Sequence, residues 1–209
     1  MPKPSGHAAR RALLEALCDY GWRVLDAEND IARLLARMDF ARSQGTDMPD
    51  WSADTLARSA GDWLLPEGLF SSVPGRGDVR AALLVHLGWD AQATLKTRAP
   101  ETLSLPSGRA APIDYLDEKA PLVTARVQEV YGLKTHPTVC GRDTPVTLSL
   151  TSPAGRPVAL TADLPGFWSG GYVDMAKDMR ARYPKHDWPA DPSTAAPHEG
   201  RTKARLGRP

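Results

Sequence analysis

Apolar residues recur at steps of three and four through the first hundred positions, which is the spacing of amphipathic helices. The stripes predict five helices, at about 7–20, 26–42, 53–65, 79–87 and 91–99. On the second helix, Arg33, Arg37 and Arg42 form a basic edge. Such an edge contacts either nucleic-acid phosphates or acidic side chains nearby, and local ion pairs are the more economical interpretation.

From Thr102 the apolar positions alternate, and a period of two predicts strands. Strands are expected at 102–105, 111–116, 146–151 and 158–161, with a proline-glycine turn joining the last two as a hairpin. The stretch 122–130 suits either a strand or a helix. A final helix runs from Tyr172 to Tyr183, where Pro184 ends it.

These elements predict an α+β fold: a helical N-terminal half, then a small, mostly antiparallel sheet with a packed C-terminal helix. The boundary is expected near Pro100, which gives a helical region over 1–99 and an α+β domain over 100–190. The remaining residues, 191–209, are rich in proline and end in basic residues, so a disordered basic tail is predicted.

The composition of the chain gives little indication of its function. The chain has 26 Lys and Arg against 25 Asp and Glu, so its overall charge does not indicate nucleic acid. From Ser152 onward nine basic residues face six acidic ones, a small excess that favours an anionic partner at this end. Cys18 and Cys140 predict neither a disulfide framework nor a thiolate metal site, which fits the cytoplasm. No apolar run approaches the roughly 20 residues of a membrane span.

The motifs of a nucleotide-hydrolysing enzyme are missing from the sequence. A P-loop requires G-x-x-x-x-G-K-[ST], and the chain contains no Gly-Lys pair. Asp117-Glu118-Lys119-Ala120 is a superficial match to a DEAH box, and its setting predicts a solvated loop. The five histidines lack the spacing of metal ligands, so no metal site is expected. We therefore predict no catalytic residues and no catalysis by this chain alone.

Basic and aromatic residues gather at the C-terminal end of the last helix. The candidate nucleic-acid-binding residues are the basic ones: Arg156, Lys177, Arg180, Arg182, Lys185 and His186. The aromatic residues are Trp168, Tyr172, Tyr183 and Trp188. They either stack on bases, at roughly 1–3 kcal/mol per base, or fasten the helix to the sheet, and their helical spacing favours the second role.

The runs SPAGRPV, LTADLPGFW and MRARYPKHDWPADP closely resemble the C-terminal end of the HrpB-type family of bacterial DEAH-box ATP-dependent RNA helicases. The resemblance implies an accessory domain without the motor, so ATP and Mg²⁺ would belong to the motor and this chain would hold no cofactor. It also implies two partners, single-stranded RNA and the motor domains. An alternative function is a protein-interaction module that tethers the helicase to a partner through the helical first half.

Overall fold

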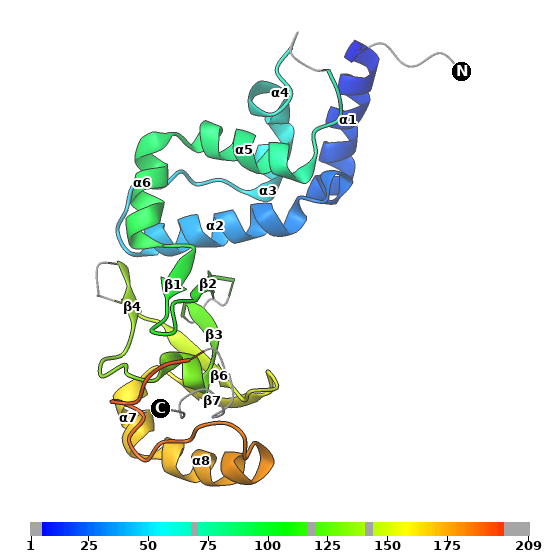
Figure 1. Ribbon diagram of the computed structural model, residues 1–209. Helices are drawn as coiled ribbons and strands as arrows, with labels where there is room; N and C mark the ends of the chain where they lie inside the picture. The colour runs from blue at the N-terminus through cyan, green and yellow to red at the C-terminus, as the bar shows by residue number, and fades with distance from the viewer. Residues whose placement is uncertain (1–5, 68–70, 117–119, 141–143, 199–209) are drawn as a thin grey trace. The chain divides into compact units, whose positions relative to one another are not determined.

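The structure is a computed structural model that describes residues 6–67, 71–116, 120–140 and 144–198 (Figure 1). It divides into two compact units, Met1–Ala99 and Pro100–Pro209. The division falls where the sequence changes from helical to strand spacing. Among the described residues, no helix has the length and apolar character needed to cross a membrane.

The regular elements in the described part of unit 1 are all helices. Its elements are α1 (Gly6–Tyr20), the 3₁₀ helix η1 (Gly21–Leu25), α2 (Glu28–Ser43), α3 (Ala53–Arg58), α4 (Ala60–Trp63), α5 (Arg76–Leu87) and α6 (Trp89–Arg98). Residues of the predicted apolar stripes form its core: Leu13, Leu17, Ile31, Leu34, Met38, Leu56 and Ala60. The expected helical half is confirmed.

Two helix boundaries differ from the sequence prediction. The helix expected over 53–65 is broken at Ser59, whose hydroxyl donates to the Thr55 carbonyl at 3.0 Å, a type of back-bonding that bends helices. Helix α5 begins at Arg76, earlier than expected, because Asp78 caps it from inside its first turn. The Asp78 carboxylate accepts a hydrogen bond from the Gly75 N–H at 2.9 Å.

The basic edge of α2 has partners within unit 1. The Arg37 guanidinium donates to the Ala99 carbonyl at 2.8 and 3.0 Å, and Arg42 pairs with Asp39 and Asp50, each at 2.6 Å. These contacts support the interpretation of this edge as a source of local ion pairs and hydrogen bonds.

Unit 2 is built on strands and two C-terminal helices. Its elements are β1 (Thr102–Ser104), β2 (Ala110–Asp114), β3 (Leu122–Arg126), the 3₁₀ helix η2 (Val127–Val130), β4 (Thr138–Val139), β5 (Thr144–Pro145), β6 (Thr147–Thr151), β7 (Pro157–Thr161), α7 (Leu164–Ser169) and α8 (Gly171–Arg182). Five strands form a sheet in the order β1-β2-β3-β6-β7, and β4 pairs with β5. Within the five-stranded sheet, the β3–β6 pair is parallel and the other pairs are antiparallel. The predicted α+β fold is confirmed.

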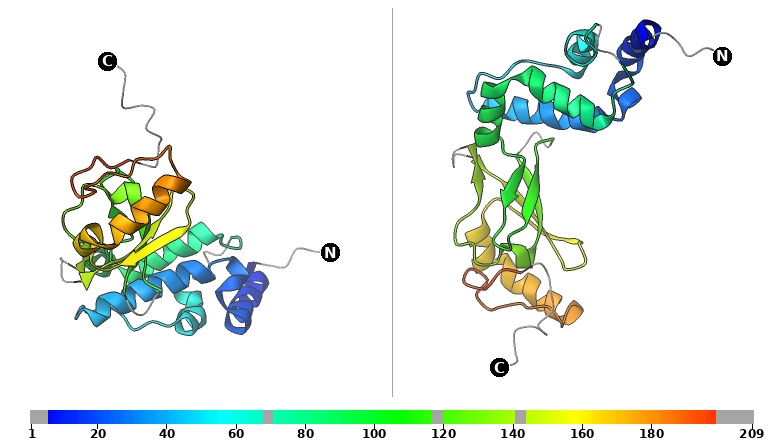
Figure 2. Two further views of the ribbon diagram at one scale, coloured as in Figure 1. Left: turned by 90° about the horizontal axis from the view of Figure 1, so that it is seen from below. Right: turned by 45° about the horizontal axis from the view of Figure 1, so that its top comes forward.

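The sheet has one strongly buried face. Val123, Ala125, Leu148 and Leu150 are at most 1% exposed. The intervening side chains belong to the opposite face, since successive residues of a strand alternate. In Figures 1 and 2, α7 and α8 follow β7 at the end of the unit.

The ambiguous stretch 122–130 is a strand followed by a 3₁₀ helix. The transition occurs where the Glu129 carboxylate accepts a hydrogen bond from the Arg126 backbone N–H at 2.7 Å. This is a capping contact, and it turns the chain out of the sheet.

The predicted disordered tail is wrong for its described part. The Gly132 N–H donates to the Pro192 carbonyl at 2.9 Å, and the His198 N–H donates to the Gln128 carbonyl at 3.1 Å. We call residues 187–198 the C-terminal strap. Backbone pairing with η2 and the loop after it orders a segment whose composition alone suggested disorder. Residues 199–209, and Asp117 to Lys119 of the DEAH-like sequence, lie outside the described residues.

Candidate nucleic-acid interface

Helix α8 and the β6–β7 turn meet at one hydroxyl. Ser152 is 1% exposed, and its Oγ accepts hydrogen bonds from the Arg156 backbone N–H at 3.2 Å and from the Tyr183 hydroxyl at 3.4 Å. Tyr183 immediately follows the last residue of α8. The turn that carries Arg156 is therefore attached to the end of the helix that carries Arg182.

Three side chains hold successive carbonyls of the C-terminal strap. They donate hydrogen bonds as follows: Tyr131 hydroxyl to the Asp187 carbonyl at 3.2 Å, Arg180 Nη2 to the Trp188 carbonyl at 2.8 Å, and Tyr172 hydroxyl to the Pro189 carbonyl at 3.0 Å. Arg180 was predicted to contact nucleic acid, but the structure gives its guanidinium a partner in the strap. Its first role is to hold the chain that follows α8.

Most of the aromatic cluster is packed inside unit 2. Trp168, Tyr172 and Trp188 are 6%, 1% and 5% exposed. Both indole N–H groups donate to backbone carbonyls, Trp168 to Leu133 at 3.0 Å and Trp188 to Tyr183 at 3.3 Å. Burial raises the pKa of the Tyr172 hydroxyl, so the ring stays neutral. These observations support the core role, while Tyr183 is half-buried.

Besides Arg180, four of the predicted basic residues are exposed: Arg156, Lys177, Arg182 and Lys185. Over the described part of the chain, none of these four side chains has a hydrogen bond or an ion pair. Arg182 is five positions after Lys177, which places the two about 140° apart around the helix. Arg156, Arg182 and Lys185 therefore belong to the two segments that meet at the end of α8, whereas Lys177 lies on another side of that helix. We call the first three the basic end.

His186 was expected to be positively charged, but its surroundings in the structure favour the neutral ring. The side chain is half-buried, and its Nδ1 has no hydrogen-bond partner among the described residues. Burial lowers the pKa of His186, and the neighbouring His198 and Arg126 lower it further. Near neutral pH the uncharged ring is favoured, so His186 contributes no cation to the basic end. A role for this residue in nucleic-acid binding stays a prediction.

The charge excess of the C-terminal segment lies entirely outside the described residues. Between Ser152 and His198 five basic residues face five acidic ones. The excess comes from Arg201, Lys203, Arg205 and Arg208, which outnumber the single acidic residue Glu199. Any binding at the basic end therefore depends on which cations lack partners, because the net charge of the described segment is zero.

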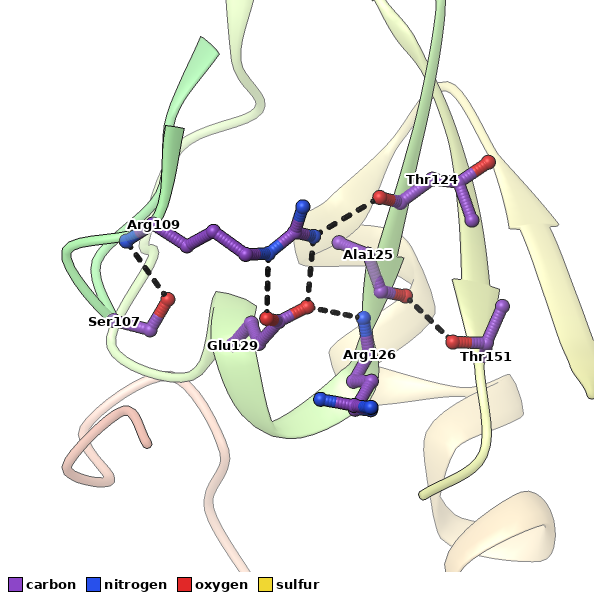
Figure 3. A network of polar contacts seen from close by, with 7 residues as sticks. All are labelled: Ser107, Arg109, Thr124, Ala125, Arg126, Glu129 and Thr151. Carbon is purple, nitrogen blue, oxygen red and sulfur yellow. Dashed lines mark hydrogen bonds and ion pairs between the residues drawn. The ribbon is translucent and has the colours of Figure 1, made fainter. Parts of the chain in front are cut away.

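Figure 3 shows a buried ion pair that the sequence did not predict. Arg109 Nε and Nη2 lie 2.6 and 2.9 Å from the two Glu129 carboxylate oxygens, and Nη2 also donates to the Thr124 carbonyl at 3.1 Å. The Glu129 side chain is 3% exposed. Burial raises the pKa of this carboxyl, but Arg109 and the Arg126 N–H outweigh it and hold the pKa below its usual value. The pair ties the β1–β2 turn to η2.

Neither the ion pair nor the histidines form a metal centre. Over the ranges that the structure describes, no group of three or more His, Cys, Asp or Glu side chains is placed to hold a metal ion. Cys18 is exposed and Cys140 is buried, and neither forms a disulfide.

The fold and this site define a small α+β domain that carries unpaired cations where a hairpin turn meets the end of a helix. The family described as ATP-dependent helicase C-terminal (HrpB_C) matches residues 72–192, which is more than half of the chain. The chain belongs to this family, and the resemblance drawn from the C-terminal runs is confirmed.

Similarity extends beyond the matched residues. The chain is 35% identical over 206 residues to the ATP-dependent RNA helicase HrpB of Escherichia coli (strain K12), covering 94% of this chain and 25% of that protein. The crystal structure of the E. coli DExH-box NTPase HrpB matches with a TM-score of 0.77 and 34% identity, covering 94% of this chain and 25% of that one. A crystal structure of the Escherichia coli DEAH/RHA helicase HrpB gives a TM-score of 0.65 and 32% identity, covering 90% and 24%. The chain thus spans about a quarter of the length of these relatives.

Proposed function

We propose that this C-terminal helicase domain contacts RNA through the basic end and acts beside a helicase motor in the cytoplasm. ATP hydrolysis and its Mg²⁺ would belong to that motor. The family membership supports the helicase setting, and the name of the E. coli relative supports RNA as the nucleic acid. Catalysis by this chain alone is not expected.

The observation that carries the proposal is that exposed cations without partners among the described residues come from two segments that meet at Ser152. Arg156 comes from the β6–β7 turn, whereas Arg182 and Lys185 lie at the end of α8, and Ser152 joins the two elements. Exposed guanidinium and ammonium groups without carboxylate partners are free to neutralise phosphates. Three such groups predict weak binding that falls steeply with salt.

A fluorescence-anisotropy titration with a short single-stranded RNA tests this function. We expect binding at ~50 mM salt that weakens strongly by ~200 mM. The double change Arg182→Glu with Lys185→Glu should abolish most of it. Arg180 is left unchanged, because its loss would release the Trp188 carbonyl and confuse binding with folding.

A charge-matched control is available in unit 1. Arg58→Glu with Lys96→Glu changes the net charge equally, and both side chains are exposed and unpaired within the described ranges. This control should bind RNA nearly as the unchanged chain does. Equal losses in the two double variants would show that total charge, not the basic end, determines binding.

Exposed apolar residues of unit 1 favour a second candidate function, protein docking. Trp89 and Val85 are 87% and 80% exposed, and tryptophan is enriched among the residues that dominate protein interfaces. A partner such as a helicase motor would bury these side chains. Calorimetric titration of the chain with a helicase motor fragment of this family should then show an affinity that changes little with salt concentration. The variant Trp89→Ala should lose this binding.

A further inference from the structure

The C-terminal strap is attached to unit 2 by individual hydrogen bonds. Three side-chain donors hold its first carbonyls. Further along, the Gly132 N–H donates to the Pro192 carbonyl at 2.9 Å, and the His198 N–H donates to the Gln128 carbonyl at 3.1 Å. Neither the five-stranded sheet nor the β4–β5 pair includes strap residues. A segment attached in this way is able to open locally while the sheet stays folded.

Two histidines flank the strap, and each has an aromatic neighbour. His186 immediately precedes the strap, and its ring meets Tyr183 edge to face at 6.0 Å. His198 is the last described residue of the strap, and its ring meets Tyr131 edge to face at 6.2 Å. Both histidines are half-buried. The closed strap therefore fixes the surroundings of both imidazoles.

The position of His186 Nδ1 disfavours a protonated ring. This nitrogen is buried and has no hydrogen-bond partner among the described residues. A protonated imidazole carries an N–H on both of its nitrogens. Protonation of His186 would therefore place a charged donor in the interior without an acceptor from the described chain, which is costly.

The charged groups around the two histidines favour the neutral rings as well. Burial, then His198 and Arg126 at the end of β3, lower the pKa of His186. Burial also lowers the pKa of His198, and Asp187 opposes this shift without reversing it. The Tyr131 hydroxyl beside His198 stays neutral, because burial raises its pKa. Geometry and electrostatics thus agree that the closed strap holds uncharged histidines.

We propose that His186 and His198 form a pH-sensitive switch, in which protonation of the two rings opens the C-terminal strap while the sheet stays folded. This inference is independent of the proposed RNA binding. Opening would release the Arg180 guanidinium from the Trp188 carbonyl. It would also bring Trp188, which is 5% exposed in the closed strap, into water.

The direction of the pH dependence follows from the two protonation equilibria. In the open strap the rings regain the ordinary histidine pKa of about 6.5. Because the closed strap lowers both pKa values, the histidines favour closure above pH 6.5. That preference is lost as the pH falls from there through the lowered values. Each histidine raises the opening equilibrium constant by at most about tenfold per pH unit.

Amide hydrogen exchange of the full chain tests this switch. After correction for the intrinsic exchange rate, protection of the Gly132 and His198 amides should fall about three- to tenfold between about pH 7.5 and about pH 5.5. The Ile113 amide in β2, which donates to the Glu101 carbonyl, should keep its protection. Unchanged protection of the two strap amides would overturn the proposal. An equal loss at Ile113 would also overturn it, since unit 2 would then be loosening as a whole.

Two variants connect the pH dependence to the histidines. His186→Gln with His198→Gln removes both titrating groups, so protection of the Gly132 amide should no longer change over this pH range. Tyr172→Phe is the matched control, because it removes the donor to the Pro189 carbonyl and leaves the histidines in place. It should lower protection at every pH and keep the dependence on pH.

The dependence on pH is the result that decides, because either variant can change the absolute protection. A fall in protection that persists in the double histidine variant would assign it to other groups and overturn the proposal. A protected strap in Tyr172→Phe that no longer responds to pH would contradict it as well.

Discussion

Glu129 carries its charge at a buried position, and its carboxylate has three hydrogen-bond donors. Its carboxylate is buried in unit 2, where an unpaired charge would be costly. Two nitrogens of Arg109 and one backbone N–H satisfy it. Arg109 is 34% exposed, so the pair lies at the edge of the core and its two members are not equivalent.

Removal of Arg109 should therefore cost more than neutralisation of Glu129. We expect Arg109→Ala to lower the free energy of unfolding by about 3–5 kcal/mol, because the carboxylate stays buried without its partner. Glu129→Gln, the matched control, should cost less, since its amide oxygen can still accept from the Arg126 N–H. Urea unfolding measures both, and equal effects would contradict the argument.

The same pair predicts a pH dependence with a definite sign. The folded-state pKa of Glu129 is lowered, so its contribution to stability is present above the unfolded value of about 4.3. That contribution is lost as the pH falls from there through the folded-state pKa. Glu129→Gln should lack this part of the acid destabilisation, which urea unfolding at a series of pH values would measure.

At the level of elements, the C-terminal strap is held closely against the loop after η2. Gly132 has a φ of +85°, and a Cβ placed there would lie 3.2 Å from the Ala195 carbonyl oxygen. Both the backbone conformation and the space favour glycine at this position. The strap is thus accommodated by a glycine as well as fastened by Tyr131, Arg180 and Tyr172.

Gly132→Ala should loosen the strap, and Gly155→Ala is its matched control. Gly155 has a φ of +78°, and a methyl group added there would meet no atom within 4 Å, so it shares the backbone cost of roughly 1–2 kcal/mol without the contact. Hydrogen exchange of the His198 amide, which donates to Gln128, is the measurement. We expect faster exchange in Gly132→Ala alone. Unchanged protection there would show that the strap does not depend on this close approach.

The whole molecule consists of two units that each have a core. Leu17, Ile31 and Leu56 are at most 1% exposed in unit 1, and Val123 and Leu148 are fully buried in unit 2. A compact segment with its own hydrophobic core is able to fold by itself. The helical and the sheet-containing halves are therefore expected to unfold as separate cooperative units.

Calorimetry should resolve two unfolding transitions, each sensitive to changes in one unit. Leu17→Ala, which removes a fully buried side chain, should destabilise one unit by about 2–5 kcal/mol and lower its transition temperature. Arg109→Ala should lower the other transition. A single transition that both substitutions shift equally would show that the units unfold together.

Local patterns in the sequence were sufficient for the helices, the β6–β7 hairpin and the α+β fold. Stripes at steps of three and four placed Leu17 and Ile31 in a core, and alternation placed Leu148 and Leu150 on one buried face. Such periodicity expresses which side of an element avoids water, so a single segment contains it. The runs at the C-terminal end were also sufficient to indicate the helicase family.

Only the tertiary structure decided which basic residues are free and which hold the fold. Arg109 and Arg180 find partners 20 and 8 positions away, whereas Arg182 has none among the described residues. The sequence shows the same charged groups without their distances. The sequence also did not reveal that the strap is ordered or that the neutral form of His186 is favoured. Hydrogen bonding and burial depend on segments that folding brings together. For a side chain with a net charge, function is determined by its neighbours in space, and those are set by the packing of the whole domain.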